Sequence, residues 1–206
     1  MMKTMNKFKH YSLAAIVLAG ITFTSCSDND VPEEENHEEI ITDVKLIFTN
    51  TNDAMDVVEV SAKDEDGEGV EELTVLGGIN LDADKSYTLT FEIMNKLDPN
   101  DPEDIKEEIE GEDFEHQIFF GFTENAFANP IGDGNIDNAS DPLNYDDKDV
   151  NNNPVGLVTS WTTGASPVSG GTFTVRLQHQ PDIKTASTGA TDGDTDFELT
   201  FDLSIN

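Results

Sequence analysis

Short segments in which apolar and polar residues alternate run through this chain from residue 39 to its last residue. In one of them, Tyr87, Leu89 and Phe91 alternate with Thr88 and Thr90. Successive side chains of a β-strand point to opposite faces, so a period of two predicts strands with one buried face. The same pattern predicts buried positions for these further residues: Ile93, Phe173, Val175, Leu177, Phe197, Leu199, Phe201, Leu203 and Ile205.

Gly, Asn, Asp and Pro separate these segments, as expected for turns between strands. The pattern predicts about eight strands, at residues 40–49, 55–62, 71–76, 86–95, 114–122, 156–163, 171–179 and 196–205. One short helix is predicted at residues 102–110, where Pro102 begins a turn and acidic residues follow. We therefore expect an all-β fold: a single antiparallel β-sandwich, Ig-like or a related Greek key, over residues 39–206. The stretch 123–155 has no alternation, and so long a loop is usually functional or disordered.

The first 25 residues have the parts of a bacterial signal peptide. Three lysines within the first nine residues precede an apolar stretch at residues 13–23, which is too short to span a bilayer comfortably. The stretch leads into residues 23–26, Phe-Thr-Ser-Cys, which resemble a bacterial lipobox with Phe in place of the usual Leu. The resemblance implies cleavage before Cys26, lipid on its thiol and amine, and stable attachment to a membrane. The alternative is an ordinary secretory peptide with Cys26 at the cleavage site by chance.

Acidic residues far outnumber basic ones. The chain has 11 Lys and Arg against 43 Asp and Glu, a formal net charge of −32, which excludes a nucleic-acid partner. Its single Cys excludes an intramolecular disulfide framework. Residues 26–38 are predicted to form a lipidated, acidic and flexible tether. Within it, residues 27–30 resemble the acidic export signal of Bacteroidota lipoproteins, which implies an outer-membrane location facing the cell exterior.

The sequence contains no short motif typical of an enzyme. The Gly-x-Ser-x-Gly elbow, the His-Glu-x-x-His zinc motif and the phosphate-binding loop are all missing. Carboxylates are so numerous that a close pair of them says nothing about glycosidase chemistry. We therefore expect a protein that is not an enzyme.

Three histidines follow the signal peptide: His37, His116 and His179. If successive strands alternate in direction, His37 and His116 lie at the end of the sandwich where the tether enters, and His179 lies at the opposite end. Imidazole and carboxylate groups together suit Zn²⁺ or a similar ion. The candidate transition-metal ligands are therefore His37, His116, Glu38, Glu112 and Glu115. The alternative is that these histidines are hydrogen-bonded residues at strand ends that bind no ligand.

Loops rich in Asp and Gly provide a second kind of candidate site. Side chains at alternate positions of a tight loop converge, and Ca²⁺ takes several oxygen ligands. In the long loop the candidate calcium ligands are Asp133, Asn135, Asp137 and Asp141. A weaker candidate is the loop with Asp64, Asp66 and Glu68, where Val75 replaces the Glu that would complete an EF-hand. The alternative in both loops is a turn without a cation.

Four segments, residues 37–42, 115–120, 153–157 and 176–181, resemble parts of small outer-membrane lipoproteins of flavobacterial-type Bacteroidota. Such lipoproteins are often labelled as having a type 1 periplasmic-binding fold. That label implies an α/β solute-binding domain, but this chain is too short for one and lacks the alternating helices. Lipoproteins of this kind tend to accompany TonB-dependent receptors, which implies nutrient or metal uptake.

Two hypotheses for the function follow. The first is an outer-membrane-anchored binding module that captures a metal ion or small ligand for a TonB-dependent receptor. The second is a structural or adhesive surface protein whose acidic loops hold Ca²⁺. Binding of Zn²⁺ that depends on histidine would favour the first, and stabilisation by Ca²⁺ alone would favour the second.

Overall fold

The computed structural model describes residues 40–64 and 72–206, which form two β-sheets and one short helix. The predicted signal peptide and the whole of the predicted tether lie outside the described residues. The elements are β1 (Asp43–Asn50), β2 (Val57–Lys63), β3 (Thr74–Leu76), β4 (Ile79–Leu81), β5 (Ser86–Asn95), β6 (Glu103–Asp104), α1 (Ile105–Gly111), β7 (His116–Phe122), β8 (Phe127–Asn129), β9 (Val158–Thr163), β10 (Val168–His179) and β11 (Asp194–Ile205). No helix in these residues is long and apolar enough to cross a membrane.

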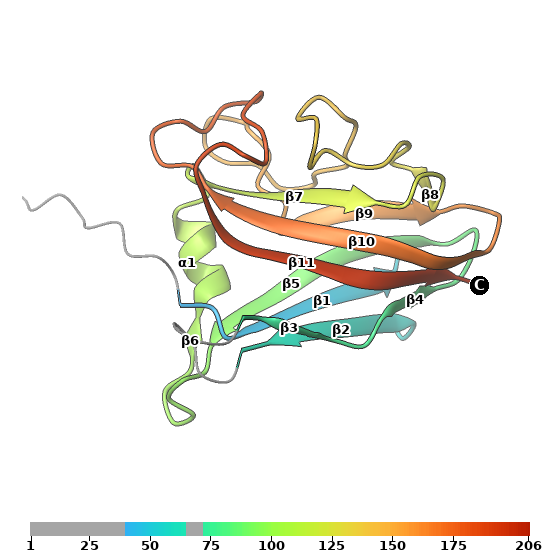
Figure 1. Ribbon diagram of the computed structural model, residues 1–206, viewed down its shortest axis with the longest axis horizontal. Helices are drawn as coiled ribbons and strands as arrows, with labels where there is room; N and C mark the ends of the chain where they lie inside the picture. The colour runs from blue at the N-terminus through green and yellow to red at the C-terminus, as the bar shows by residue number, and fades with distance from the viewer. Residues whose placement is uncertain (1–39, 65–71) are drawn as a thin grey trace, which may run out of the picture. The chain divides into compact units, whose positions relative to one another are not determined.

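The larger sheet has seven strands in the order β3-β2-β1-β5-β9-β8, with β6 paired to β5. Every pairing in it is antiparallel, and the sheet curls into a half-barrel (Figure 1). The smaller sheet has four strands in the order β4-β11-β10-β7. Its β4 runs parallel to β11, so the expectation of a wholly antiparallel fold is wrong for this one pair.

Each of the eight predicted strands corresponds to an observed strand, with boundaries that differ by a few residues. The sequence pattern missed β4, β6 and β8. These strands have only two or three residues, too few to show an alternation. The predicted helix is α1, which begins after Asp104, whose carboxylate accepts a hydrogen bond from the Glu107 backbone N–H.

The core lies between the two sheets and is rich in aromatic side chains. The twelve positions named above as predicted to be buried are all buried. Phe173 of the smaller sheet meets Phe48 of the larger one edge to face, with ring centroids 5.7 Å apart. Trp161 lies 5.4 Å from Phe120 and 4.8 Å from Phe127, measured between ring centroids. Each large side chain buried in this way stabilises the fold by about 1.5–3 kcal/mol.

Strand β7 departs from the alternating pattern, because all seven of its residues are buried. Phe114 begins the predicted strand at residues 114–122, where the alternation places it in phase with the core-facing Ile118 and Phe120. It precedes the observed strand, however, and is 43% exposed, so this part of the prediction is wrong. The long loop after β7 covers the strand's open edge. Its residues pair with β7 through an Ile118 N–H bond to the Val155 carbonyl (2.7 Å) and an Asn135 N–H bond to the Phe120 carbonyl (2.7 Å). The loop thereby satisfies backbone groups that an edge strand would otherwise expose.

Gly134 makes this close approach possible. Its φ is +100°, and a Cβ atom at this position would lie 2.1 Å from the Phe120 carbonyl oxygen. A side chain here would therefore clash with β7 and would also strain the backbone.

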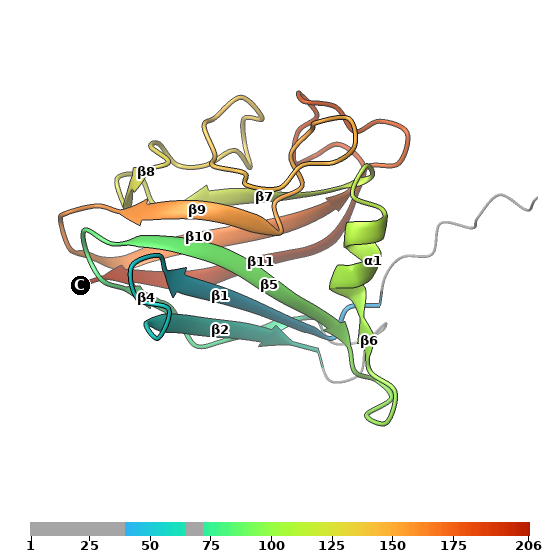
Figure 2. The same cartoon turned by 180° about the vertical axis from the view of Figure 1, so that it is seen from behind.

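Because of the long loop, the strands that follow it run in the opposite direction to the one that simple alternation of strands predicts. Strands β7 and β9 both point away from the end where α1 lies, so the chain between them travels back along the sandwich (Figure 1 and Figure 2). The loop between β10 and β11 therefore lies at the α1 end. The expectation that His179 lies far from His116 is wrong, because these two residues face each other across β10 and β7.

Candidate functional site

Three aspartates of the long loop converge on one point. One carboxylate oxygen from each of Asp133, Asp137 and Asp141 lies within 4.8 Å of the other two. Asp133 and Asp137 are exposed, and Asp141 is half-buried. Three negative charges this close repel one another, and a divalent cation bound between them would remove the repulsion.

Local hydrogen bonds shape the loop that carries these aspartates. The Asn138 side-chain oxygen accepts bonds from the Ser140 backbone N–H (3.2 Å) and hydroxyl (2.8 Å). Its amide nitrogen donates to an Asp141 carboxylate oxygen (2.8 Å). At the other side of the cluster, the Asp133 carbonyl accepts a bond from the Phe122 N–H of β7 (2.8 Å). The cluster is thus connected directly to the sheet.

Asn135, the fourth predicted calcium ligand, points away from this cluster. Its side chain is buried, and its oxygen accepts a bond from the Phe120 N–H (3.0 Å). Its amide nitrogen donates to the Tyr145 hydroxyl (2.9 Å), which in turn donates to the Ile118 carbonyl (2.7 Å). Burial raises the pKa of Tyr145 to about 12, although the bonds from Asn135 and Gln117 lower it. Asn135 and Tyr145 therefore hold the loop on β7.

The histidines form a second cluster, at the α1 end. His116 and His179 are both buried, and their rings stack with centroids 4.5 Å apart and an interplanar angle of 6°. The Nδ1 atom of His116 lies 3.2 Å from the Glu112 carbonyl oxygen, so Glu112 contributes its backbone rather than its carboxylate. The Nε2 atom of His179 lies 3.3 Å from a carboxylate oxygen of Glu115.

These histidines and Glu115 do not bring three ligand atoms within 4.8 Å of one another. Among the described residues, the aspartate cluster of the long loop is the grouping that does so. His37 and Glu38, the other predicted members of the transition-metal site, lie outside the described residues.

Of the predicted calcium loop at residues 64–68, the structure describes only Asp64, and it does not describe the predicted lipidation site. The Asp64 N–H donates to the Thr42 carbonyl (2.8 Å). Its predicted companions Asp66 and Glu68 lie outside the described residues, as does Cys26.

Sequence reasoning missed a buried polar layer between the long loop and the loop after β10. Asp149 and Lys184 form an ion pair (3.2 Å) with side chains that are 0% and 1% exposed. Asp147 accepts backbone N–H bonds from Gly156 (2.9 Å), Leu157 (2.8 Å) and Val158 (3.2 Å). In an acidic loop, Asp147 and Asp149 look like ordinary solvated aspartates. The one signal in the sequence was Lys184, a single basic residue in the polar loop after β10, which indicated an acidic partner.

The pKa values in this layer reflect burial and its compensation. Burial raises the pKa of Asp147, even though three backbone N–H groups favour its charged form. Burial also opposes ionisation of Asp149, but bonds from Asn153 and Lys184 outweigh it and hold the Asp149 pKa below its ordinary value. Burial lowers the pKa of Lys184, despite the nearby charge of Asp149.

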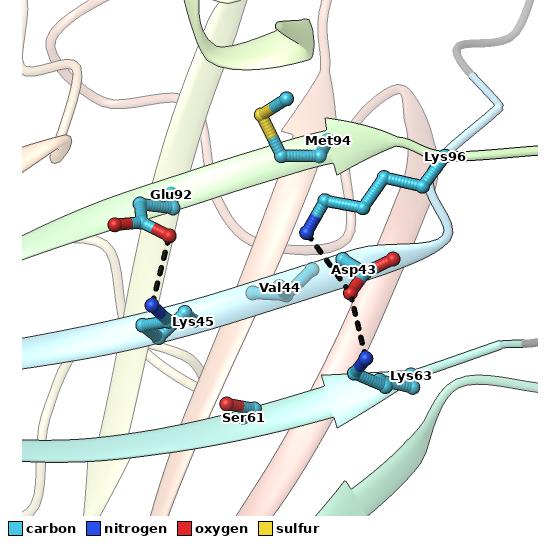
Figure 3. Close-up of a pocket in the computed structure, with 8 residues that line it drawn as sticks. All are labelled: Asp43, Val44, Lys45, Ser61, Lys63, Glu92, Met94 and Lys96. Carbon is cyan, nitrogen blue, oxygen red and sulfur yellow. Dashed lines mark hydrogen bonds and ion pairs between the residues drawn. The ribbon is translucent and has the colours of Figure 1, made fainter. Parts of the chain in front are cut away.

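A shallow pocket on the outer face of the larger sheet contains three of the chain's few lysines (Figure 3). Lys63 and Lys96 both contact one carboxylate oxygen of Asp43, at 3.3 and 3.2 Å. Lys45 contacts Glu92 at 3.0 Å. Lys45 also lies 3.9 Å from a carboxylate oxygen of Glu59, so three carboxylates face the three lysines, and the pocket offers no excess of positive charge for an anionic ligand.

Comparison with family models, with curated proteins and with solved structures finds no match to this chain.

Proposed function

We propose that this protein is a non-enzymatic, lipid-anchored module of the bacterial outer membrane that binds Ca²⁺ through Asp133, Asp137 and Asp141. The observation that carries the proposal is the convergence of these three carboxylates on an exposed loop. Up to six carboxylate oxygens, completed by water, suit the coordination that Ca²⁺ prefers. We further propose that residues 39–206 form an Ig-like or Greek-key β-sandwich, in keeping with the two sheets around one core.

The support of the loop favours Ca²⁺ binding over a merely acidic turn. Asn135 and Tyr145 hold the loop against β7, and Asn138 holds Asp141 in place. A loop that is ordered before binding loses less conformational entropy when the ion arrives. The strong negative charge of the chain adds a long-range attraction for cations.

The test compares Ca²⁺ with Mg²⁺ at equal ionic strength by thermal unfolding. We expect Ca²⁺ to raise the melting temperature more than Mg²⁺, because Mg²⁺ demands a compact octahedron and releases its water reluctantly. Asp137→Asn should abolish the difference between the two ions. Asp202→Asn is the matched control, since it removes the same charge from an exposed position on β11. If Ca²⁺ and Mg²⁺ raise the melting temperature of the unchanged protein equally, screening of its negative charge explains the whole effect and the calcium site is rejected.

The membrane anchor has its own test. Lipid on Cys26 would attach the protein to the outer membrane, facing the cell exterior, by at least two acyl chains. Cys26→Ser should therefore move the protein from the membrane fraction to the soluble fraction or block its maturation. Unchanged membrane partitioning of this variant would contradict the lipoprotein proposal.

A second candidate function is capture of a transition metal for a TonB-dependent receptor. The observation that favours it is the stacked pair His116 and His179 with Glu115 at the α1 end. His37 and Glu38 precede β1, which begins at the same end, and would supply the remaining ligands (Figure 1). Because His179 stacks on His116, we expect both His116→Ala and His179→Ala to weaken Zn²⁺ binding in calorimetry, together with His37→Ala.

If none of the three histidine substitutions changes the affinity for Zn²⁺, the ion binds to the acidic surface and not to the histidines. The uptake function would then lose its candidate chemistry, while the calcium proposal would be unaffected.

A further inference from the structure

A lysine and an aspartate lie in contact, fully buried, where three loops meet. The Lys184 Nζ atom lies 3.2 Å from the Asp149 Oδ2 atom, and neither side chain is more than 1% exposed. Nζ also donates to the Asp113 carbonyl (2.5 Å), in the turn between α1 and β7. Lysine and aspartate are among the residues least often buried, so a fully enclosed pair is a feature to explain.

Hydrogen bonds hold the two oxygens of Asp149 in different ways. Oδ1 accepts the backbone N–H groups of Asn151 and Asn153, both at 2.8 Å. Oδ2 faces the amine and receives a longer bond from the Asn153 side chain (3.3 Å). Two N–H groups on one oxygen form the arrangement that stabilises an oxyanion during acyl transfer, and the other oxygen is placed to accept protons.

We propose that Lys184 and Asp149 become joined by an amide bond between Nζ and Cγ. The bond would covalently link the long loop to the loop after β10. Nothing in the chemistry requires an oxidant, a reductant or a second molecule, because an ammonium and a carboxylate together contain the atoms of an amide and one water.

The step proceeds by proton transfer and attack within the pair. The Lys184 ammonium passes one proton to Oδ2, which leaves a neutral amine beside a carboxylic acid. The nitrogen lone pair attacks Cγ, and the negative charge moves to Oδ1, where the Asn151 and Asn153 N–H groups stabilise it. The Cγ–Oδ2 bond then breaks, and Oδ2 leaves as water with a second proton from the nitrogen.

The lowered pKa of Asp149 opposes proton transfer to Oδ2, and three other features of the surroundings favour the reaction. Burial lowers the pKa of Lys184, which makes the neutral amine easier to reach. The contacts with Asp113 and Asp149 hold the amine against the carboxyl group, and such positioning removes much of the entropic barrier. Because bulk water is excluded from both side chains, the reverse hydrolysis is disfavoured.

The test is mass spectrometry of the purified full chain after denaturation. We expect a chain lighter by one water molecule than its sequence and its other modifications require. Trypsin should then yield one branched peptide that joins residues 149–176 to residues 177–206, because an amide at Lys184 blocks cleavage there. Its mass should equal the sum of the two peptides less one water.

Two variants that keep every trypsin site sharpen the result. Lys184→Arg should eliminate the branched peptide and restore cleavage at residue 184. Lys148→Arg, at the neighbouring exposed lysine, should leave the branched peptide in place.

Separate, unmodified peptides 177–184 and 185–206 from the unchanged protein would overturn the proposal and leave an ion pair only. A chain that has lost water but yields no branched peptide would overturn it equally, since the water would then have come from an aspartate elsewhere.

Discussion

The core between the sheets is fully buried, the polar layer between the long loop and the loop after β10 is buried or half-buried, and different forces stabilise the two regions. The core is held by Phe48, Phe120, Trp161 and Phe173, whose contacts are apolar and have little directional demand. The layer is held by directed hydrogen bonds: the Asp147 carboxylate accepts from backbone N–H groups, and the Tyr145 hydroxyl, which also belongs to the layer, donates to a backbone carbonyl. Loss of a core side chain leaves a cavity, whereas loss of a layer side chain leaves polar groups without partners.

This difference predicts how each region fails. Damage to the core should lower the stability of the whole domain, because both sheets share that core. Damage to the layer should release the part of the long loop after β8 first, because individual hydrogen bonds and isolated bridges, rather than a continuous strand ladder, join that part to β7 and β9. The following changes test this distinction, in order of decreasing expected effect.

Phe173→Ala should have the largest effect. Phe173 is fully buried and meets Phe48 of the larger sheet and Phe120 of its own sheet, so its loss should reduce the free energy of unfolding by about 3–5 kcal/mol. Urea unfolding measures the change. Met55→Ala, at a side chain that is 90% exposed, is the control and should change it by less than about 0.5 kcal/mol. A small effect of Phe173→Ala would mean that the sheets do not depend on this core.

Asp147→Asn should cost about 2–3 kcal/mol, because an amide group would face backbone N–H donors that now bind a carboxylate. Amide hydrogen exchange should speed up at Gly156, Leu157 and Val158. Asp146→Asn is the neighbouring control, at an exposed residue.

Equal acceleration of exchange in β10 would contradict the distinction between core and layer. It would mean that the layer and the sheets unfold as a single unit.

Tyr145→Phe should cost about 1–2 kcal/mol, because the Ile118 carbonyl and the Asn135 side chain lose their shared partner. Tyr87→Phe is the matched control. The Tyr87 hydroxyl makes one hydrogen bond, from the Asp82 N–H at 3.1 Å, so its removal should cost less. Urea unfolding of both variants measures the difference, and an equal cost would show that the Tyr145 bonds do not hold the loop.

Asp43→Asn should have the smallest effect, below about 1 kcal/mol, because its ion pairs lie on the outer face of the sheet (Figure 3). Burial opposes its ionisation, but hydrogen bonds from Lys96, Thr42 and Lys63 prevail and lower the Asp43 pKa from 3.8.

The sign of this pKa change sets the pH dependence. A lowered carboxyl pKa in the folded state contributes stability above the unfolded value, and this contribution is lost as the pH falls through the folded value. The difference between the unchanged protein and Asp43→Asn, measured by urea unfolding, should therefore be present at neutral pH and vanish in strong acid. A difference that persists in strong acid would assign the effect to packing.

Several features of the candidate sites could be predicted from the sequence. The spacing of Asp133 and Asp137 indicated a loop that gathers carboxylates, and the structure brings them together with Asp141. The role of Asn135 could not be predicted, since a ligand and a buried hydrogen-bonding residue look alike in an Asp-rich loop. The sequence prediction placed His179 at the wrong end of the sandwich, because the long loop runs back along the sandwich and reverses the direction of the strands that follow it.

The sequence by itself determined which faces of the long strands are buried, because alternation is a property of each strand alone. Only the tertiary structure decided that both faces of β7 are buried and that Lys184 meets Asp149, 35 positions earlier in the chain. These contacts depend on where the long loop lies, and polar residues in a loop carry no periodic signal of their partners. Directed hydrogen bonds hold that path, and their donors and acceptors lie on segments far apart in the sequence that only the folded sheets bring together.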